Sequence, residues 1–568
     1  MLSTRRIMKA WIYGVLALAS APAGATPVPA GPGGSGAVWG YHPRAGESAE
    51  YPDVCSLDAA HAEVPFTPAA GRSADCPTPP PPPSGVCPGT RELHEDLNSC
   101  QGERCCLPGS VGPGGVVDVV PYLTRPAAWP FSADTSVDHS TDVDDSPGIA
   151  QAIECAMSQS TTRHTVAFPA GRYVLRTPLR PEHDDLTLEG PELFPDAVPG
   201  DPGTATLVAL PCNPEQFPGV IQVNKTDTVS RVGIRNFQIA LTDGPRVRAN
   251  SGIRINNCSE CAVENVIMRY EPLSPQPPEC KPEHLDGITF SLGSGGVIRN
   301  VIVDGVPKGG IYLSSITGYH ATPPILVENC EIKNSDGPVG AGGIKIITSN
   351  VTVRNCESHH NRVSSPSRPG GYGLWIATQV PGIDNPSPVP SNVVVQDSYF
   401  HHNGNSGVTM ASAVEDHRPM DIELVRVGSA YNGSYGVHIQ AGTDLKLRDV
   451  SSWGNGYYGI YLTSRTTLAA SSLRVGSVLL ENPHVFDNAL TATSALPGIM
   501  IEASNVTIHR GELARYGASG GNQTRSIQQR CWTSGPPGEQ VLFHPENNVI
   551  SGVRTRGTSA PEVLACTL

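Results

Sequence analysis

Hydrophobic and polar residues alternate with a period of two through much of the second half of this chain. Between Gly343 and Gly459 one pattern occurs four times: a glycine, an alternating strand, a second alternating strand, a polar turn and a closing Asn. A period of two is typical of β-strands, because successive side chains point to opposite faces. This stretch therefore predicts short strands arranged in a repeat.

The repeat extends well beyond these four units. Nine glycines, 23 to 39 residues apart, are each followed by an aliphatic, any residue and another aliphatic: Gly252, Gly287, Gly310, Gly343, Gly373, Gly407, Gly436, Gly459 and Gly498. The shortest spacing is enough for three short strands and three turns, which make one coil of a solenoid. We predict an all-β solenoid of parallel strands.

A second series of polar residues follows one strand of each coil: Asn236, Asn265, Asn300, Asn329, Asn355, Asp397, Asp449 and Asn482. In stacked coils such side chains lie about 4.8 Å apart, and amides at that spacing can hydrogen-bond to the next coil. Arg426 takes this position in one coil, so we expect the stack to be interrupted there. The next residue in each coil, Phe237 or Val266 for example, is expected to point into the core.

The coils resemble the right-handed parallel β-helix of the pectate lyase-like superfamily. The segment from Asp144 to Gly190 is similar to the first coils of many members, and the resemblance covers roughly residues 132–568. It implies the fold and a carbohydrate-active class of protein. The specific motifs of polygalacturonase-like hydrolases, of one pectate lyase family and of alginate epimerases are absent or incomplete, so the resemblance does not imply one reaction.

The domain organisation follows from composition. Residues 1–25 combine basic residues, an apolar run and a small-residue cleavage site, as in a secretory signal peptide. Residues 26–131 are rich in Cys and Pro and are interpreted as a loop region or stalk. Residues 132–568 form the predicted β-helix domain, with an amphipathic capping helix at about 147–158 behind Ser146, and a cover over the C-terminal end at about 517–568.

The cysteines indicate an oxidising compartment, either extracellular or periplasmic. Six lie in the N-terminal region and are expected to form disulfides: Cys55, Cys76, Cys87, Cys100, Cys105 and Cys106. Cys258 and Cys261 have metal-ligand spacing, but we favour a disulfide, with Cys280 as one partner to consider. Cys531 and Cys566 are candidates for tying down the C-terminal tail.

The formal net charge of −14 argues against a nucleic-acid partner. We expect a secreted monomer that has no membrane association once the signal is removed. An acidic stretch from Asp134 to Asp145 is compatible with calcium, although it lacks the EF-hand pattern, and its carboxylates also suit the start of the capping helix.

One face of the solenoid carries the candidate functional residues. The outward residues of the glycine-led strands are Arg254, Thr289, Tyr312, Lys345, Trp375, Thr409, His438, Tyr461 and Met500, with Tyr372, Tyr435 and Tyr458 just before their glycines. Long inserts flank the same strands: 271–283, 314–324, 362–371, 378–391 and 411–421. Aromatic rings, cations and flanking loops together predict a groove for an acidic polysaccharide, with Arg254, Tyr312, Trp375, Tyr435 and Tyr461 binding it.

The reaction we favour is β-elimination from a uronate-containing polysaccharide, as in a polysaccharide lyase. Lys345 is the candidate base, since aromatic neighbours that exclude water would lower its pKa. His438 and Arg362 are the other candidate catalytic residues, as proton donor or neutraliser of the substrate carboxylate, and Arg254 is a further neutraliser. A non-catalytic adhesin or glycan-binding solenoid is the alternative, and a glycoside hydrolase using Asp286 or Asp336 is the third.

Two His-His pairs, His359-His360 and His401-His402, recur in adjacent coils before the closing Asn. Four imidazoles can bind a transition metal, but the following coils lack histidine at this place, so we interpret the pairs as repeat-derived turn residues.

Overall fold

The computed structural model divides the chain into two compact units, Met1–Cys105 and Cys106–Leu568. The structure describes residues 38–42, 47–51, 106–123, 144–193, 203–209, 219–242, 250–271, 285–291, 295–314, 324–337, 342–363, 370–378, 389–412, 418–464, 475–516, 522–534, 541–543, 545–559 and 561–563. In the first unit these residues form one antiparallel hairpin, β1 (Val38–His42) with β2 (Glu47–Tyr51). The predicted signal peptide, the proline run and five of the six N-terminal cysteines lie outside the described residues.

The second unit contains a sheet of twelve strands, which we call the glycine-led sheet. Its strands in chain order are β8 (Gly219–Ser230), β10 (Asn250–Ser259), β12 (Leu285–Ser291), β14 (Gly309–Ser314), β18 (Gly342–Ile347), β22 (Tyr372–Thr378), β25 (Val408–Ser412), β28 (Val437–Ile439), β31 (Ile460–Thr463), β34 (Leu496–Glu502), β37 (Gln523–Gln529) and β42 (Glu562–Val563). Neighbouring strands pair in parallel, each with its counterpart in the next coil.

Two further strand layers complete each coil. In the first coils these layers are formed by β3 (Val117–Asp118), β4 (His164–Ala167), β5 (Gly171–Leu175), β6 (Leu186–Glu189), β7 (Ala205–Ala209), β9 (Gly233–Thr242), β11 (Ala262–Glu271) and β13 (Gly296–Asp304). One later layer stacks β15 (Ile325–Glu328), β19 (Val351–Arg354), β23 (Ser391–Gln396), β26 (Met420–Val425), β29 (Gly442–Arg448), β32 (Val475–Glu481), β35 (Val506–His509) and β40 (Val549–Ser551). The other stacks β16 (Glu331–Lys333), β20 (Glu357–His359), β24 (Tyr399–His401), β27 (Gly428–Ala430), β30 (Ser451–Trp453), β33 (His484–Phe486), β36 (Glu512–Ala514) and β41 (Arg554–Arg556).

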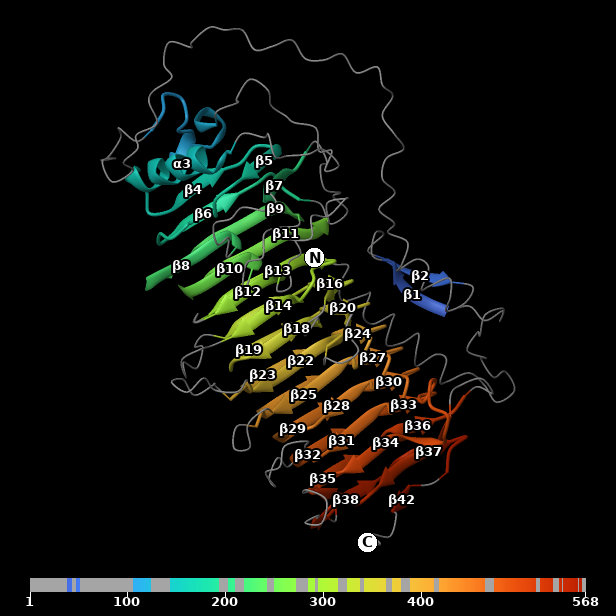
Figure 1. Cartoon of the computed structure of the whole chain (residues 1–568). Coiled ribbons are helices and arrows are strands. Elements are labelled where there is room, and N and C mark those ends of the chain that lie inside the picture. The colour runs from blue at the N-terminus through green and yellow to red at the C-terminus, as the bar shows by residue number, and fades with distance from the viewer. Residues whose placement is uncertain are drawn as a thin grey trace. The chain divides into compact units, whose positions relative to one another are not determined.

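Small elements accompany the coils. They are the 3-10 turns η3 (Pro113–Gly115) and η4 (Val120–Tyr122), the parallel pair β17 (Asp336–Gly337) and β21 (Arg362–Val363), and the antiparallel pair β38 (Trp532–Ser534) and β39 (Val541–Phe543). Figure 1 shows the stacked strands of this unit running from α3 to β42. The all-β parallel β-helix predicted from the repeat is confirmed.

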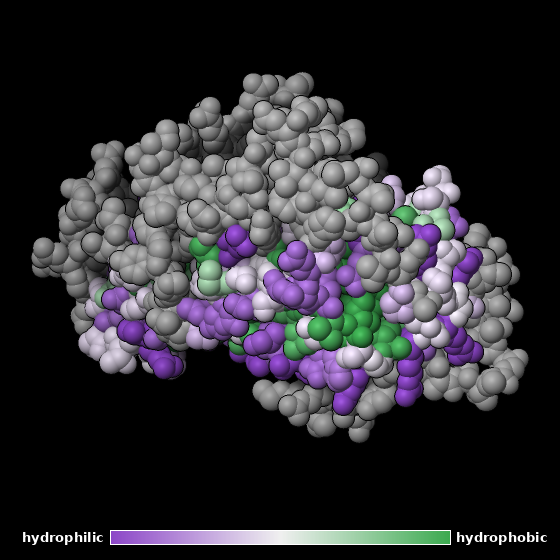
Figure 2. Space-filling model, turned by 90° about the horizontal axis from the view of Figure 1, so that it is seen from below, coloured by the Kyte–Doolittle hydropathy of each residue, from purple (hydrophilic) through white to green (hydrophobic). Residues whose placement is uncertain are grey.

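A continuous aliphatic core runs inside the coils. The glycine that starts each unit is needed where the chain turns into the glycine-led sheet. At Gly343 an added Cβ would lie 1.7 Å from Ser358 Oγ and 2.4 Å from the carbonyl oxygen of Gly373, so a side chain has no room there. Figure 2, viewed from below, shows a hydrophobic patch bordered by hydrophilic residues. Val549, in the last described strand of its layer, is 54% exposed, as expected where no further coil covers it.

The polar turn residues stack as predicted. Asn236, Asn265, Asn300, Asn329 and Asn355 all have φ between 52° and 61°, a conformation that Asn tolerates. From Asn265 onward each amide Nδ2 donates to the Oδ1 of the preceding coil at 2.9–3.3 Å, and the Nδ2 of Asn236 donates to the Gly190 carbonyl at 3.3 Å. The expected interruption at Arg426 is only partial: Arg426 keeps a φ of 52°, and its guanidinium donates to both oxygens of Asp397 at 2.6 and 2.8 Å. An ion pair replaces the amide contact.

A second, buried amide ladder lies at the closing Asn of each coil. Asn361, Asn403, Asn432, Asn455 and Asn488 each donate from Nδ2 to the amide oxygen of the next coil at 2.8–3.0 Å, and Gln523 ends the series. Each of these oxygens beyond Asn361 also accepts a backbone N–H at 2.9–3.3 Å. The sequence pattern identified the turn but not this network.

The capping helix α3 (Ser146–Ser158) packs Ile149, Ala152, Ile153 and Ala156 into the core. Its start differs from the prediction. Asp145, not Ser146, is the N-cap residue, and the Oδ1 of Asp144 accepts the Ser146 N–H at 3.0 Å and its hydroxyl at 2.6 Å.

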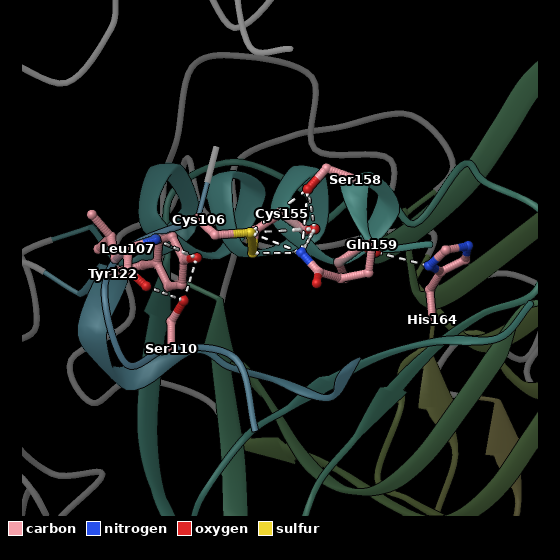
Figure 3. Close-up of a disulfide and its surroundings, with 9 residues drawn as sticks. Cys106, Leu107, Ser110, Tyr122, Cys155, Ser158, Gln159 and His164 are labelled. Atoms are coloured by element: carbon pink, nitrogen blue, oxygen red, sulfur yellow. Dashed lines mark hydrogen bonds between the residues drawn. A yellow bond between two sulfur atoms is a disulfide. The ribbon is translucent and has the colours of Figure 1, made fainter. Parts of the chain in front are cut away.

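A disulfide joins Cys106 to Cys155 of this helix (Figure 3). Cys106 had been assigned to the cluster of N-terminal cysteines, and the structure instead links it to the β-helix unit. Nearby, Tyr122 Oη accepts the Leu107 N–H at 3.1 Å and shares a 2.8 Å hydrogen bond with Ser110 Oγ. These contacts fasten the segment from Cys106 to Tyr122 across the first coil.

The remaining described cysteines have clear states. Cys258 and Cys261 form a disulfide with each other, so the disulfide interpretation holds, without Cys280. Cys330 and Cys356 are free and buried in the core. Cys531 is disulfide-bonded, while its predicted partner Cys566 lies outside the described residues. The tail predicted as a cover contributes β37, β40, β41 and β42, which continue the parallel stack.

Candidate functional site

The glycine-led sheet brings the candidate residues into one outward row. Strand pairing places the following residues on successive coils: Gln222, Arg254, Thr289, Tyr312, Lys345, Trp375, Thr409, His438, Tyr461, Met500 and Gln528. We call this set the outward row. From Arg254 to Met500 its register follows from the glycine two residues earlier, because each of these coils restarts the alternation at the same place.

Lys345 lies between two aromatic rings within this row. Its Nζ is 4.8 Å from the centre of the Tyr312 ring and 4.5 Å from that of Trp375. Burial of the ammonium, together with the charge of Lys308, lowers the pKa of Lys345 to about 8, although Asp286 acts in the opposite direction. A substantial fraction of this amine is therefore neutral at mildly alkaline pH and able to accept a proton.

Lys308 and Asp286 complete the charged group around Lys345. Lys308 Nζ lies 2.8 Å from Asp286 Oδ2 and 5.6 Å from the centre of the Tyr312 ring. Asp286 directly precedes Gly287 and pairs with Gly309 of the next coil, while Lys308 lies opposite Leu285, whose carbonyl accepts the Lys308 N–H at 3.0 Å. From the sequence, Asp286 was a candidate only for hydrolysis and Lys308 was not a candidate, because Lys308 lies neither between the paired aliphatics nor directly before Gly310.

The aromatic faces are already occupied, which changes how the row can bind sugar. Lys345 covers one face each of Tyr312 and Trp375, and the His438 and Tyr461 rings stack at 5.0 Å with an angle of 7°. Stacking of a sugar on those faces, as predicted, would require these side chains to move. The polar edges and charges of the row are the more accessible means of recognition.

A second group of rings surrounds His438. Tyr435 lies 4.5 Å from His438 and 5.8 Å from Tyr458, measured between ring centres. Tyr461 donates its hydroxyl to the buried Glu502 at 2.7 Å, and Arg530 Nε donates to the same carboxylate at 2.6 Å. This group lies toward the C-terminal end of the row.

The position of His438 does not suit a proton donor acting with Lys345. Three coil spacings separate the two residues, roughly 14 Å. Burial also lowers the pKa of His438 to about 3, so its imidazole is neutral at ordinary pH. Its Nδ1 lies 3.4 Å from Gln440 Nε2, while its buried Nε2 has no hydrogen-bond partner among the described residues. His438 is thus not placed to supply a proton to the sugar unit at Lys345.

Three consecutive residues of the row share this feature. Besides His438, the indole Nε1 of Trp375 and the hydroxyl of Thr409 are buried and have no hydrogen-bond partner in the part of the chain that the structure describes. Buried polar groups in folded proteins are normally paired, and unpaired ones call for an explanation. Their concentration on adjacent coils marks this part of the row.

The other predicted residues lie farther from Lys345. Arg254 is three coils away along the row, toward the N-terminus. Arg362 is exposed on β21, which pairs with β17 and is not part of the glycine-led sheet, and Asp336 is on β17 itself. Arg362 is therefore not a member of the outward row, contrary to its grouping with Lys345. Most residues of the long inserts lie outside the described residues, so flanking walls stay a prediction.

The histidine pairs form a separate cluster on another layer. His359 stacks on His401 at 4.8 Å and His360 on His402 at 5.0 Å, between ring centres. In each pair the two Nδ1 atoms are 2.7 Å apart, and the buried member reaches a glutamate: His359 to Glu331 at 3.2 Å, His401 to Glu357 at 2.6 Å.

This cluster holds charge, but it lacks the arrangement of a metal centre. Among the described residues, no three His, Cys, Asp or Glu side chains are arranged to hold a metal ion. Burial opposes the charge of Glu331, yet Lys333 and His359 lower its pKa far below the ordinary value. Burial, with the charge of Glu331, raises the pKa of Glu357 to about 7. The interpretation of all four as turn residues holds in part: His360 and His402 have φ of 56° and 52°, whereas His359 and His401 are the last residues of β20 and β24.

The calcium site considered for the acidic stretch from Asp134 to Asp145 stays a prediction. Asp134, Asp138 and Asp142 lie outside the described residues, and Asp144 is engaged at the start of α3, where its Oδ1 also accepts the Arg176 N–H at 2.9 Å. Within the part of the chain that the structure describes, no helix is both long and apolar enough to span a membrane.

Comparison with known proteins agrees with this architecture. Residues 133–361 match a family model described as Rhamnogalacturonase A/epimerase, pectate lyase-like. This part of the β-helix is thus similar to the pectate lyase-like family, in agreement with the resemblance noted in its first coils and repeats. No curated protein sequence matches the chain.

Several solved structures are similar to it. The A-module of the mannuronan C-5 epimerase AlgE4 from Azotobacter vinelandii has a TM-score of 0.42 and 17% identity, covering 75% of this chain and 94% of its own. PfbA, a surface adhesin of Streptococcus pneumoniae, has a TM-score of 0.42 and 12% identity, covering 79% and 93%. Tailspike protein 3 of bacteriophage CBA120 has a TM-score of 0.44 and 11% identity, covering 76% and 58%.

Proposed function

We propose that this protein is a secreted, carbohydrate-active β-helix protein that cleaves an acidic polysaccharide by β-elimination. In this reaction a base removes the proton at C5 of a uronate unit, the C4–O bond to the preceding sugar breaks, and a C4–C5 double bond forms. The electron pair of the broken bond leaves with the oxygen, which then takes a proton. Disulfides in the described region favour an oxidising, extracellular or periplasmic location.

The observation that supports this function best is the state of Lys345. Its amine is held between Tyr312 and Trp375, and its pKa is lowered to about 8. Efficient general bases have a pKa near the working pH, and an ordinary strand lysine does not. After Lys345 has taken the proton from C5, its ammonium can donate that proton to the leaving oxygen. One residue can therefore act as both the base and the acid of the reaction.

The test is incubation of the full chain with polygalacturonate, alginate and glucuronate-containing polymers, following absorbance near 235 nm, roughly where the unsaturated product absorbs. The change Lys345→Ala should lower the rate by roughly 100-fold or more, because a general base contributes about 10²–10⁴. The matched control is Lys446→Ala. Lys446 is also a half-buried strand lysine, but it lies on β29, outside the glycine-led sheet.

Two results would contradict the proposal. One is the absence of unsaturated product from every polymer with the unaltered protein. The other is equal activity of the Lys345 and Lys446 variants. In either case Lys345 is not the base of an elimination.

A non-catalytic glycan-binding protein is the second candidate. It is favoured by the buried polar atoms of Trp375, Thr409 and His438, which lack a hydrogen-bond partner among the described residues and supply no acid or base. Binding of a polymer without any product, retained in Lys345→Ala, would select this candidate.

A hydrolase is less well supported. Glycoside hydrolysis usually needs two carboxylic groups flanking the bond. Asp286 is ion-paired with Lys308, and Asp336 lies on β17 outside the glycine-led sheet.

A further inference from the structure

The charges around Lys345 are unequal. Two ammonium groups, those of Lys345 and Lys308, act on one another here, whereas Asp286 is the carboxylate that offsets them. A like charge nearby is costly unless a second anion compensates it. Among the residues that the structure describes, this group therefore has one positive charge more than negative charges whenever both lysines are protonated.

The Lys308 ammonium has more hydrogen-bond donors than described acceptors. An ammonium has three N–H donors, and the one described partner of Lys308 is Asp286 Oδ2 at 2.8 Å. The Asp286 side chain is 8% exposed, but that of Lys308 is 26% exposed. Lys308 thus presents donors to the outside while the buried aspartate holds it in place.

The column that contains Asp286 continues with two glycines. Strand pairing puts Gly309, Gly342 and then Tyr372 on the next three coils. The Asp286 carboxylate reaches into the space at the first of them, because its Oδ1 lies 3.0 Å from where a Cβ of Gly309 would be. Tyr312 and Lys345 lie in the outward row, on the same strands as Gly309 and Gly342. Neither glycine places a side chain between the Asp286 carboxylate and the strand of Lys345.

We propose that Lys308 recognises the carboxylate of the sugar unit on which Lys345 acts, and that Asp286 is a positioning residue that holds the Lys308 ammonium beside it. The ligand class is a sugar acid with a free carboxylate, and an esterified or neutral sugar is excluded. This assignment rests on the proposed function for the identity of the polymer. It replaces Arg254 and Arg362, which lie away from Lys345, as the group that neutralises the carboxylate.

The experiment measures affinity, so it does not depend on turnover. Calorimetric titration would compare trisaccharides of galacturonate, glucuronate, guluronate and mannuronate with their methyl esters. The unaltered protein should bind at least one acid more tightly than its ester. The change Lys308→Met keeps the aliphatic stem over Tyr312 and should reduce that preference roughly 10- to 100-fold, the value of one hydrogen bond to a charged group.

Removal of Lys308 alone leaves Asp286 buried without its partner, which can impair folding. The double variant Lys308→Met with Asp286→Asn removes both charges and should show the same loss of preference in a folded protein. Lys446→Met is the control for the loss of a lysine elsewhere and should keep the preference.

The outcomes separate the two proposals. An acid preference that survives in the double variant, or no acid preference for any of the four sugars, overturns the assignment of Lys308 even if elimination is observed. An acid preference that depends on Lys308, without any absorbance at 235 nm from a polymer, upholds the carboxylate site and refutes the elimination.

Discussion

The buried amide ladder makes a strong prediction about stability, centred on Asn432. Its Oδ1 accepts the Asn403 backbone N–H at 3.1 Å and the Asn403 Nδ2 at 3.0 Å. Its Nδ2 lies 2.9 Å from Asn455 Oδ1, 3.2 Å from the Phe400 carbonyl and 3.2 Å from Ser429 Oγ. The residue is 1% exposed, so water cannot replace these partners.

The change Asn432→Ala removes all of these contacts and leaves two donors of the buried Asn403 without an acceptor. An unsatisfied buried group costs about 1–3 kcal/mol, so the total destabilisation should be about 3–5 kcal/mol. In a solenoid this loss acts first on the neighbouring coils, because each coil contacts only its neighbours.

The control is Asn300→Gly in the outer ladder. Asn300 is exposed, and glycine accepts its φ of 53°, so the change removes only two amide contacts that water can replace. The expected cost is about 1 kcal/mol or less. Urea unfolding followed by circular dichroism gives the totals, and amide hydrogen exchange shows whether protection is lost mainly in β24, β27 and β30. Equal costs for the two changes, or a loss spread evenly over the solenoid, would refute the reasoning.

Three further predictions follow from charges and cross-links. Because the folded pKa of Glu357 is raised to about 7 from an ordinary 4.5, its contribution to stability is fully present below pH 4.5 and is lost as the pH rises through 7. The change Glu357→Gln should therefore reduce the fall in melting temperature between pH 5 and 8, roughly the span of that titration. The control is Glu512→Gln, at the same position of β36, where the carboxylate accepts the Tyr516 hydroxyl; this change should leave the fall as it is. The lowered pKa of Lys345 predicts that elimination rises with pH through about 8 and then levels off, and that this amine is acylated at pH 8 ahead of ordinary lysines, as peptide mass spectrometry can show. A profile flat across that range would exclude a titrating base. Cys155→Ser removes the disulfide to Cys106, which spans 49 residues, and should destabilise the first coils by about 4 kcal/mol on the loop-entropy model. The measurement is amide hydrogen exchange, which should become faster in α3 and β4. Unchanged exchange would mean that packing alone stabilises the capping helix.

The fold and the order of the outward row could be predicted from the sequence because each coil carries its own marker. A glycine restarts the period of two in every coil, so an error in one insert does not shift the next strand. The stacking of Asn236 with Asn265, and the pairing of Tyr312, Lys345 and Trp375, follow from that local rule. The same rule predicted a lowered pKa for Lys345, since residues on adjacent coils lie about 4.8 Å apart.

Other features were decided only by the tertiary structure. Periodicity states which face a side chain is on, but it does not state how far a flexible chain reaches or which charge it meets. Lys308 pairs with Asp286 across 22 residues, and Cys106 pairs with Cys155 across 49. Neither pair occupies a position that the repeat marks.

The distance between two residues along the stack of coils was also decided by the tertiary structure. His438 and Lys345 share a face, yet three coils lie between them, and burial keeps the histidine neutral. The sequence by itself determined the coil, its faces and its order, because these depend on local alternation of side chains. The tertiary structure decided which groups meet, because contacts and pKa values depend on separation and on exclusion of water, and both are set by how successive coils stack.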